Sequence, residues 1–118
     1  MVDLFDFDFG PGARATDPET SHIAAKRPAW RARRDRTYVL IAHYEHSSGL
    51  TDFELAALLE KQQTSVGKRR GELRDMGFIE ETQDRRPAPS GSPAIVWRIT
   101  QDGIGCAREI MRERARTH

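Results

Sequence analysis

The sequence of 118 residues contains a single cysteine, Cys106, so it forms no internal disulfide and no cysteine-based zinc cluster. It also lacks any apolar run long enough to cross a bilayer, since the longest candidate covers only residues 38–42. The first nine residues contain three aspartates, where a secretory signal requires a basic start and an apolar centre. These absences predict a cytoplasmic protein with reduced thiol and no membrane partner.

Motifs for catalysis and for cofactor binding are missing too. The sequence shows no nucleophile–base pattern, no phosphate-binding loop and no metal-ligand spacing. Gly103 and Gly105 lack the third glycine and the strand–turn–helix setting that a dinucleotide site needs. His43 and His46 are spaced for a metal ion, but only Glu45 stands nearby, so we expect them on a helix surface. The sequence therefore predicts a protein that is not an enzyme and needs no metal or cofactor.

Neither sign of charge is in excess, because 19 lysines and arginines against 18 aspartates and glutamates give a formal net charge of +1. The charges are nevertheless unevenly distributed. The first nine residues contain three acids and no base, residues 26–36 contain six bases and one acid, and residues 61–74 contain five bases and one acid. Because local charge attracts a phosphate backbone, the two basic blocks favour a nucleic acid as partner.

Apolar residues with helical spacing predict several helices, and local signals mark where these begin and end. Thr51 and Glu54 match a capping box, and Gly77 is typical of the residue that follows a helix. Leu55, Leu58 and Leu59 are expected to face inward. After Gly77 the apolar period changes to two, which predicts a hairpin with a long irregular loop at 84–93. The expected helices are at 17–26, 35–46, 51–60, 63–76 and 101–116, and the expected strands are at 78–83 and 94–100.

This order of elements predicts a mainly α fold with a small antiparallel β-hairpin, a winged helix-turn-helix with an N-terminal extension and a C-terminal helix. The expected divisions are an acidic and aromatic tail at 1–16, a short helix and basic connector at 17–34, the winged helix-turn-helix at 35–100, and the last helix at 101–118. The apolar stripe of that last helix either joins two copies in a homodimer or covers the chain's own core. Its members are Ile104, Ala107, Ile110 and Met111.

The third helix of the winged domain is the expected recognition helix, because its basic outer face protrudes and fits a major groove. Glutamine, threonine and serine side chains at its start exchange hydrogen bonds with bases, and the lysine and arginines that follow meet phosphates or guanine. Arginines at the hairpin tip reach the DNA backbone or the minor groove. The candidate DNA-binding residues are Gln62, Gln63, Thr64, Ser65, Lys68, Arg69, Arg70, Arg85 and Arg86. The competing interpretations are a solvated helix face and a hairpin that binds protein.

Residues 50–98 resemble the winged helix family, in particular repressors with a MarR-type fold. The resemblance rests on LTDFELA at 50–56, SV at 65–66, LRDMGFI at 73–79 and AIVWRIT at 94–100. Together with DPETSHIAA at 17–25, the chain is similar to small winged-helix proteins encoded by actinobacterial phages. This resemblance implies a regulator of transcription or a replication accessory that binds double-stranded DNA inside a bacterial host cell. One feature differs from the resemblance: Gly67 and Gly71 lie inside the third helix, and each lowers the stability of that helix by ~1 kcal/mol relative to alanine.

The acidic and aromatic start of the chain suggests a second kind of function. Leu4, Phe5, Phe7 and Phe9 alternate with aspartates, a pattern that suits an anchor for a groove on a host protein. The chain would then be a winged-helix adaptor or inhibitor. Two alternatives exist for the same residues: they fold back on the basic face as a phosphate mimic, or they form a disordered end. The sequence does not separate these alternatives.

Overall fold

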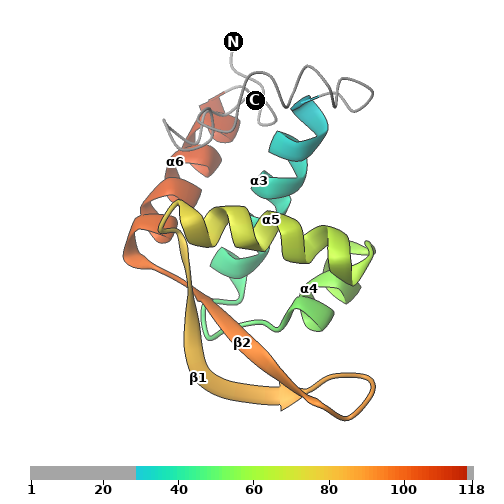
Figure 1. Ribbon diagram of the computed structural model, residues 1–118. Coiled ribbons are helices and arrows are strands. Elements are labelled where there is room, and N and C mark those ends of the chain that lie inside the picture. Colours follow the sequence, from blue (N-terminus) through green and yellow to red (C-terminus); the bar gives the residue numbers. More distant parts are fainter. Residues whose placement is uncertain (1–28, 117–118) are drawn as a thin grey trace.

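The structure is a computed structural model that describes residues 29–116. In chain order its elements are α3 (Ala29–Glu45), α4 (Asp52–Leu59), α5 (Gln63–Asp75), β1 (Ile79–Pro87), β2 (Pro93–Ile99) and α6 (Gln101–Arg116). In Figure 1, α5 lies across α3, and the hairpin projects from the end of the molecule opposite to the start of α3. A hairpin that follows three helices and precedes a fourth confirms the predicted winged helix-turn-helix fold. The predicted helix at 17–26 and the tail at 1–16 lie outside the described residues.

Helix α3 begins at Ala29, six residues before Asp35, where the sequence predicts its start. The expected basic connector is therefore helical over residues 29–34. Alanine and arginine, which make up most of this stretch, are strong helix formers, and no breaker separates them from the apolar periodicity that follows. The Thr37 hydroxyl donates to the Arg33 carbonyl at 2.9 Å, one turn back in the same helix. The part of the first basic block that the structure describes, residues 29–36, thus lies on a regular helix.

Two sequence-based expectations about burial are wrong. His43 is completely buried, although we expected it on a helix surface. It lies one turn after Val39 and Leu40 on the side of α3 that faces the core, and both of those are buried as well. Leu58 is 47% exposed, although we expected it to face inward. Helix α4 has only eight residues, and Leu55 alone among them is fully buried.

The core lies between α3, α5, the base of the hairpin and α6. Its buried members include Val39, Leu40, Leu55, Val66, Leu73, Ile79, Trp97, Ile99, Ala107 and Ile110. Helix α6 approaches the chain closely at Gly103, where an added Cβ would lie 2.2 Å from the Phe78 carbonyl oxygen. Ala107 and Ile110 are completely buried within this single chain, so the stripe of α6 covers the chain's own core to a large extent.

The hairpin is longer than the sequence predicts. Strand β1 continues to Pro87, through residues that we expected in an irregular loop, so the tip is reduced to residues 88–92. The register shifts between Glu81 and Arg85, and the Thr82 hydroxyl donates to the Val96 carbonyl at 2.7 Å within this bulge. A two-stranded sheet has two free edges, which lets a strand end on proline without losing a ladder hydrogen bond.

Two local signals give the structure that the sequence predicts. The Thr51 hydroxyl accepts from the Glu54 amide at 3.1 Å, and the Glu54 carboxylate accepts from the Thr51 amide at 2.9 Å, which completes the capping box. Gly77 follows α5 with a φ of +84°. The Gly77 amide donates to the Arg74 carbonyl and the Phe78 amide to the Leu73 carbonyl, both at 2.9 Å, as a Schellman motif requires.

Candidate nucleic-acid interface

The N-terminus of α5 is polar and open. Gln62 caps the helix by its backbone alone, without a side-chain hydrogen bond, and the first turn contains no acidic residue. Gln62, Thr64 and Ser65 are exposed, and Gln63 is half-buried. A helix start with uncapped amides and no carboxylate attracts anions through its dipole. The predicted base-reading residues therefore gather at the one end of α5 that suits a phosphate-rich ligand.

The outward face of α5 follows the stripe Thr64, Lys68, Gly71 and Asp75, whose spacing of four, three and four residues keeps them on one side. Lys68 is exposed and forms no ion pair with any other residue in the range 29–116. Towards the C-terminus the stripe becomes acidic at Asp75. The N-terminal half of the helix is accordingly the part that suits DNA.

Arg70 does not belong to this outward face, which corrects a sequence-based prediction. Its guanidinium donates to both carboxylate oxygens of Asp52, at 3.0 and 2.6 Å, and lies 3.9 Å from the centre of the Trp97 ring. The side chains of Arg70 and Asp52 are only 14% and 12% exposed. Each helical residue turns by about 100° from the previous one, so consecutive bases do not share a face. Arg70 holds α5 against α4 and β2.

Arg69 is similarly engaged. Its guanidinium forms an ion pair with Glu72 at 3.1 Å, and its side chain is 14% exposed. Glu72 in turn accepts a hydrogen bond at 2.8 Å from Arg36 of α3, which is buried. Arg69 therefore takes part in a network that joins α5 to α3. Of the three consecutive bases predicted to contact DNA, only Lys68 stands clear of its own protein.

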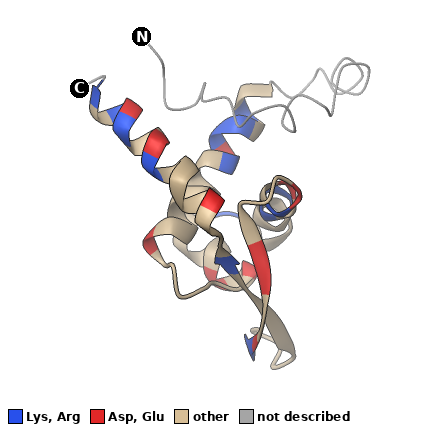
Figure 2. Cartoon of the chain, turned by 90° about the vertical axis from the view of Figure 1, so that its left-hand side faces the viewer, with Lys and Arg blue, Asp and Glu red and all other residues tan. Residues whose placement is uncertain are grey.

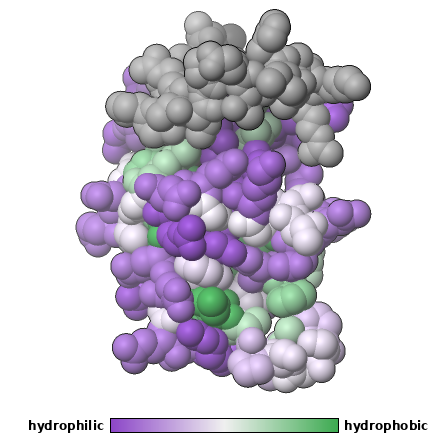
Figure 3. Space-filling view, in the orientation of Figure 1, coloured by the Kyte–Doolittle hydropathy of each residue, from purple (hydrophilic) through white to green (hydrophobic). Residues whose placement is uncertain are grey.

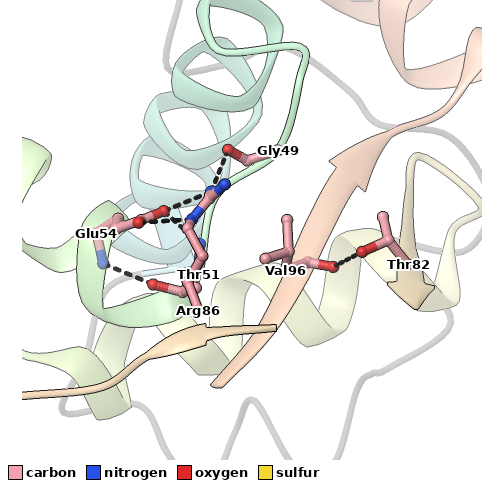
Figure 4. A network of polar contacts seen from close by, with 6 residues as sticks. All are labelled: Gly49, Thr51, Glu54, Thr82, Arg86 and Val96. Carbon is pink, nitrogen blue, oxygen red and sulfur yellow. Dashed lines mark hydrogen bonds and ion pairs between the residues drawn. The ribbon is translucent and has the colours of Figure 1, made fainter. Parts of the chain in front are cut away.

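Arg86 fastens the wing to the start of α4, as Figure 4 shows. Its guanidinium donates to both oxygens of the Glu54 carboxylate and to the Gly49 carbonyl, each at 2.8 Å. Hydrogen bonding from Arg86 lowers the pKa of Glu54 below its usual value. Glu54 thus caps α4 and anchors the hairpin with one carboxylate. Arg86 thus has an internal role in the described structure, and its predicted DNA contact stays a prediction.

Arg85 lies on the exposed edge of the hairpin. It donates to the carbonyls of Thr82 and Asp84 at 2.9 and 2.8 Å, and it pairs with Glu81 at 3.2 Å. These partners are all exposed or half-buried, and the Arg85 side chain is 39% exposed. An exposed ion pair of this kind contributes at most about 1 kcal/mol, so Arg85 exchanges its partner at little cost.

The wing tip and the start of α5 lie along the same shallow groove. Its walls include Phe53 of α4, Gln63 of α5, and Ser90 and Ser92 of the tip. In Figure 3 the described surface around the groove is mostly hydrophilic, whereas the groove itself is also lined by apolar side chains, among them Phe53, Pro93 and Ile95. In Figure 2 basic and acidic residues alternate along α6, whereas the start of α3 is mainly basic. Binding at this face would depend on a few exposed cations and on polar contacts.

The two glycines of α5 have different surroundings. An added Cβ at Gly67 would lie 3.1 Å from a carboxylate oxygen of Asp52, whereas a Cβ at Gly71 would meet nothing within 4 Å. Close packing therefore accounts for Gly67 but not for Gly71. Gly71 lies on the outward stripe, where a bare backbone lets a ligand approach closely.

Replacing Gly71 with alanine is expected to raise the free energy of unfolding by about 1 kcal/mol, because alanine favours the helix and no atom obstructs the methyl group. Urea denaturation followed by circular dichroism measures this change. Gly67→Ala is the matched control on the same helix, and it should gain less because the carboxylate of Asp52 has to shift. A loss of stability in Gly71→Ala would mean that its backbone is not in an ordinary helical conformation.

The described residues contain neither a metal-binding group nor a membrane span. Between residues 29 and 116, no three histidine, cysteine, aspartate or glutamate side chains come together as metal ligands. No helix in the same part of the chain combines the length and the apolar content needed to cross a membrane. Leu4, Phe5, Phe7 and Phe9 lie outside the described residues, so their predicted partner contact stays a prediction.

Comparison with known proteins gives a likeness in structure only. No protein-family model matches the chain, and no curated protein matches it. Among solved structures, the chain is similar to a double mutant of ZitR from Lactococcus lactis in its apo form. The TM-score is 0.58 at 17% sequence identity, over 84% of this chain and 67% of the ZitR chain. At this identity the likeness shows the fold alone: the chain shares its winged helix-turn-helix with a MarR-family regulator.

Proposed function

We propose that this protein binds double-stranded DNA as a transcription regulator and catalyses no reaction. The observation that carries the proposal is the polar, uncapped start of α5, which stands exposed beside the hairpin in a winged helix-turn-helix. In this fold such a helix start enters the major groove. The likeness to ZitR supports the same geometry, since that protein is a regulator with this fold.

The proposed contacts are fewer than the sequence predicts. Gln62, Gln63, Thr64 and Ser65 read base edges, and a glutamine at the helix start suits adenine. Lys68 and Arg85 meet phosphates on either side of the groove between α5 and the wing. Arg69, Arg70 and Arg86 act indirectly, because they fix the positions of α5 and the wing.

Selection of bound fragments from random double-stranded DNA tests the proposal. We expect enrichment of a short sequence, with binding that weakens steeply as salt rises. Negligible affinity for any DNA at low salt would reject the proposal. The interpretation as an adaptor, with the acidic and aromatic residues 2–9 as the contact, would then replace it. The selected sequences also report symmetry: two inverted half-sites indicate a dimer on DNA, and a single site indicates a monomer.

Replacing Lys68 with alanine is expected to weaken DNA binding about tenfold at low salt and to reduce the slope of log affinity against log salt by about 1. The reason is the loss of one phosphate contact from an exposed cation without an internal partner in the described structure. Fluorescence anisotropy at several salt concentrations measures both quantities. Arg108→Ala on the exposed side of α6 is the control, and it should leave the slope unchanged. Equal slopes for wild type and Lys68→Ala would remove Lys68 from the interface.

We also propose a homodimer through α6, although less apolar surface is left for a partner than the four-residue stripe predicts. Ala107 and Ile110 are fully buried in the single chain, which leaves Met111, 39% exposed, and the half-buried Ile104 for a second copy. Light scattering of the intact chain gives its mass directly.

An origin in a phage and a role as replication accessory are likewise predictions from the sequence resemblance.

A further inference from the structure

The exposed side of α3 carries aromatic and basic residues at the end of the molecule opposite to the wing. Trp30, Arg34 and Tyr38 follow one another at intervals of four residues, and Arg31 lies beside them on the same side. We refer to these four residues as the α3 face. Trp30 is 41% exposed and Tyr38 is 36% exposed, so the α3 face contains two of the four large hydrophobic side chains that stand out from the described surface.

The cations of the α3 face are oriented by the tryptophan ring and not by strong ion pairs. The guanidinium carbons of Arg31 and Arg34 lie 5.6 and 5.1 Å from the centre of the Trp30 ring. Arg34 approaches the Asp35 carboxylate only at 3.4 Å, and Arg31 forms no ion pair with any carboxylate in residues 29–116. An aromatic ring flanked by two cations, of which Arg31 has no carboxylate partner in the described residues, is a surface for a ligand that is both aromatic and acidic.

The chain itself contains a segment of this chemistry. Residues 2–9 read VDLFDFDF, with three aspartates, three phenylalanines and no base. We propose that residues 2–9 dock on the α3 face of their own chain, with phenylalanine rings against Trp30 and Tyr38 and aspartates beside Arg31 and Arg34. This proposal does not rest on the proposed DNA binding.

The length of the connection permits this contact. Residues 10–28 separate the segment from the start of α3, and 19 residues span at most about 65 Å when fully extended. The α3 face extends over about 12 Å from Trp30 to Tyr38 at the rise of an α-helix. Because the segment and the α3 face belong to one chain, docking is intramolecular and needs less complementarity than binding between separate chains.

The outward face of α5 is less suited to bind residues 2–9 than the α3 face is. Arg69, Arg70 and Arg74 of α5 already pair with Glu72, Asp52 and Asp75 respectively. Aspartates from residues 2–9 would have to compete with these internal carboxylates. Lys68 is the one cation of α5 without an ion pair in residues 29–116, and no aromatic ring lies beside it, whereas Arg31 and Arg34 both flank the Trp30 ring. The described part of α5 also presents no exposed large hydrophobic side chain, and phenylalanine rings need such a partner. Charge and apolar contact together favour the α3 face over α5.

Paramagnetic broadening in the full-length chain tests the proposal. A spin label is attached at Val2→Cys in a Cys106→Ala background, which leaves one thiol, and amide signals are compared with the label oxidised and reduced. We expect the strongest broadening at amides in residues 30–38 and weaker broadening over residues 63–75, which lie behind α3. Broadening centred on α5, or broadening that follows no surface region, overturns the proposal.

Two variants and one mixture make the result specific. Arg31→Glu should abolish the broadening over residues 30–38, whereas Arg108→Glu should leave it unchanged. Arg108 is the matched control because it is also exposed on a helix and has no ion pair with a carboxylate in the described residues. Equal effects of the two variants overturn the proposal. A last sample mixes ¹⁵N-enriched chains that have no spin label with spin-labelled chains that have no ¹⁵N. The ¹⁵N-enriched chains should show no broadening. Broadening in this mixture means that the segment docks on a second copy, and it also overturns the proposal.

Discussion

Replacing Arg70 with alanine is expected to lower the free energy of unfolding by about 3 kcal/mol, the largest loss among the basic residues of α5. The substitution removes a bidentate pair with Asp52 and the cation above the Trp97 ring, and it leaves the Asp52 carboxylate nearly buried without its counter-charge. We take the lower end of the range for buried pairs because the two side chains keep 14% and 12% of their surface exposed. Chemical denaturation at neutral pH measures the loss.

Arg74→Ala is the control for this prediction. Arg74 lies on the same helix and pairs with Asp75, but their side chains are 51% and 72% exposed. A pair this open contributes at most about 1 kcal/mol, so the variant should be nearly as stable as the wild type. Equal losses in Arg70→Ala and Arg74→Ala would mean that Arg70 does not hold α5 in place. The Asp52→Asn, Arg70→Ala double variant should lose less than the sum of the single changes, because the two residues interact directly.

The free energy of unfolding is also expected to fall by about 3 kcal/mol between pH 7 and pH 4 through His43 alone. The pKa of His43 is lowered from 6.5 to about 4, mainly by burial; nearby Arg70 and His46 contribute to this lowering, and Asp52 opposes it. Between these two pKa values the unfolded chain binds a proton that the folded chain does not. The stability contributed by neutral His43 is therefore complete above pH 6.5 and is lost as the pH falls through about 4.

Comparison with His43→Leu isolates this effect from the titration of carboxylates. Leucine has a similar size and no ionisable group, so the difference in stability between variant and wild type should grow as the pH falls from 7 to 4. At pH 7 the variant should be at least as stable, because neither ring nitrogen of His43 has a hydrogen-bond partner in the described structure. Parallel curves of stability against pH would contradict the prediction. His46→Gln, at an exposed position, should follow the wild type.

The part of the site that could be predicted from the sequence depends on neighbouring residues. Thr51 and Glu54 are three residues apart, and their capping box forms as expected. The same holds for the polar start of α5, since Gln62 and the residues after it follow a short turn. What the sequence did not reveal about Glu54 is its second contact, with Arg86, which lies 32 residues further along the chain. A carboxylate that fits a cap gives no sign that it also receives a wing arginine.

His43 shows the same limit for burial. Its neighbours Val39 and Leu40 indicate a core-facing side of α3, but a histidine in that position is equally compatible with the edge of the stripe. Its burial follows from the packing of other elements around α3, and no residue close in sequence specifies it. The pH dependence predicted above therefore follows from the fold and not from the histidine content.

The sequence by itself determined the order and type of the elements, because caps, glycine stops and apolar periods act within a few residues. It also determined that α5 begins with polar side chains and that the wing carries Arg85. Only the tertiary structure decided which cations remain available to a ligand. Arg70 and Arg86 find carboxylates 18 and 32 residues away, whereas Lys68, two residues before Arg70, is exposed and forms no ion pair within residues 29–116. An ion pair depends on distance in space, which the sequence encodes only through the complete fold.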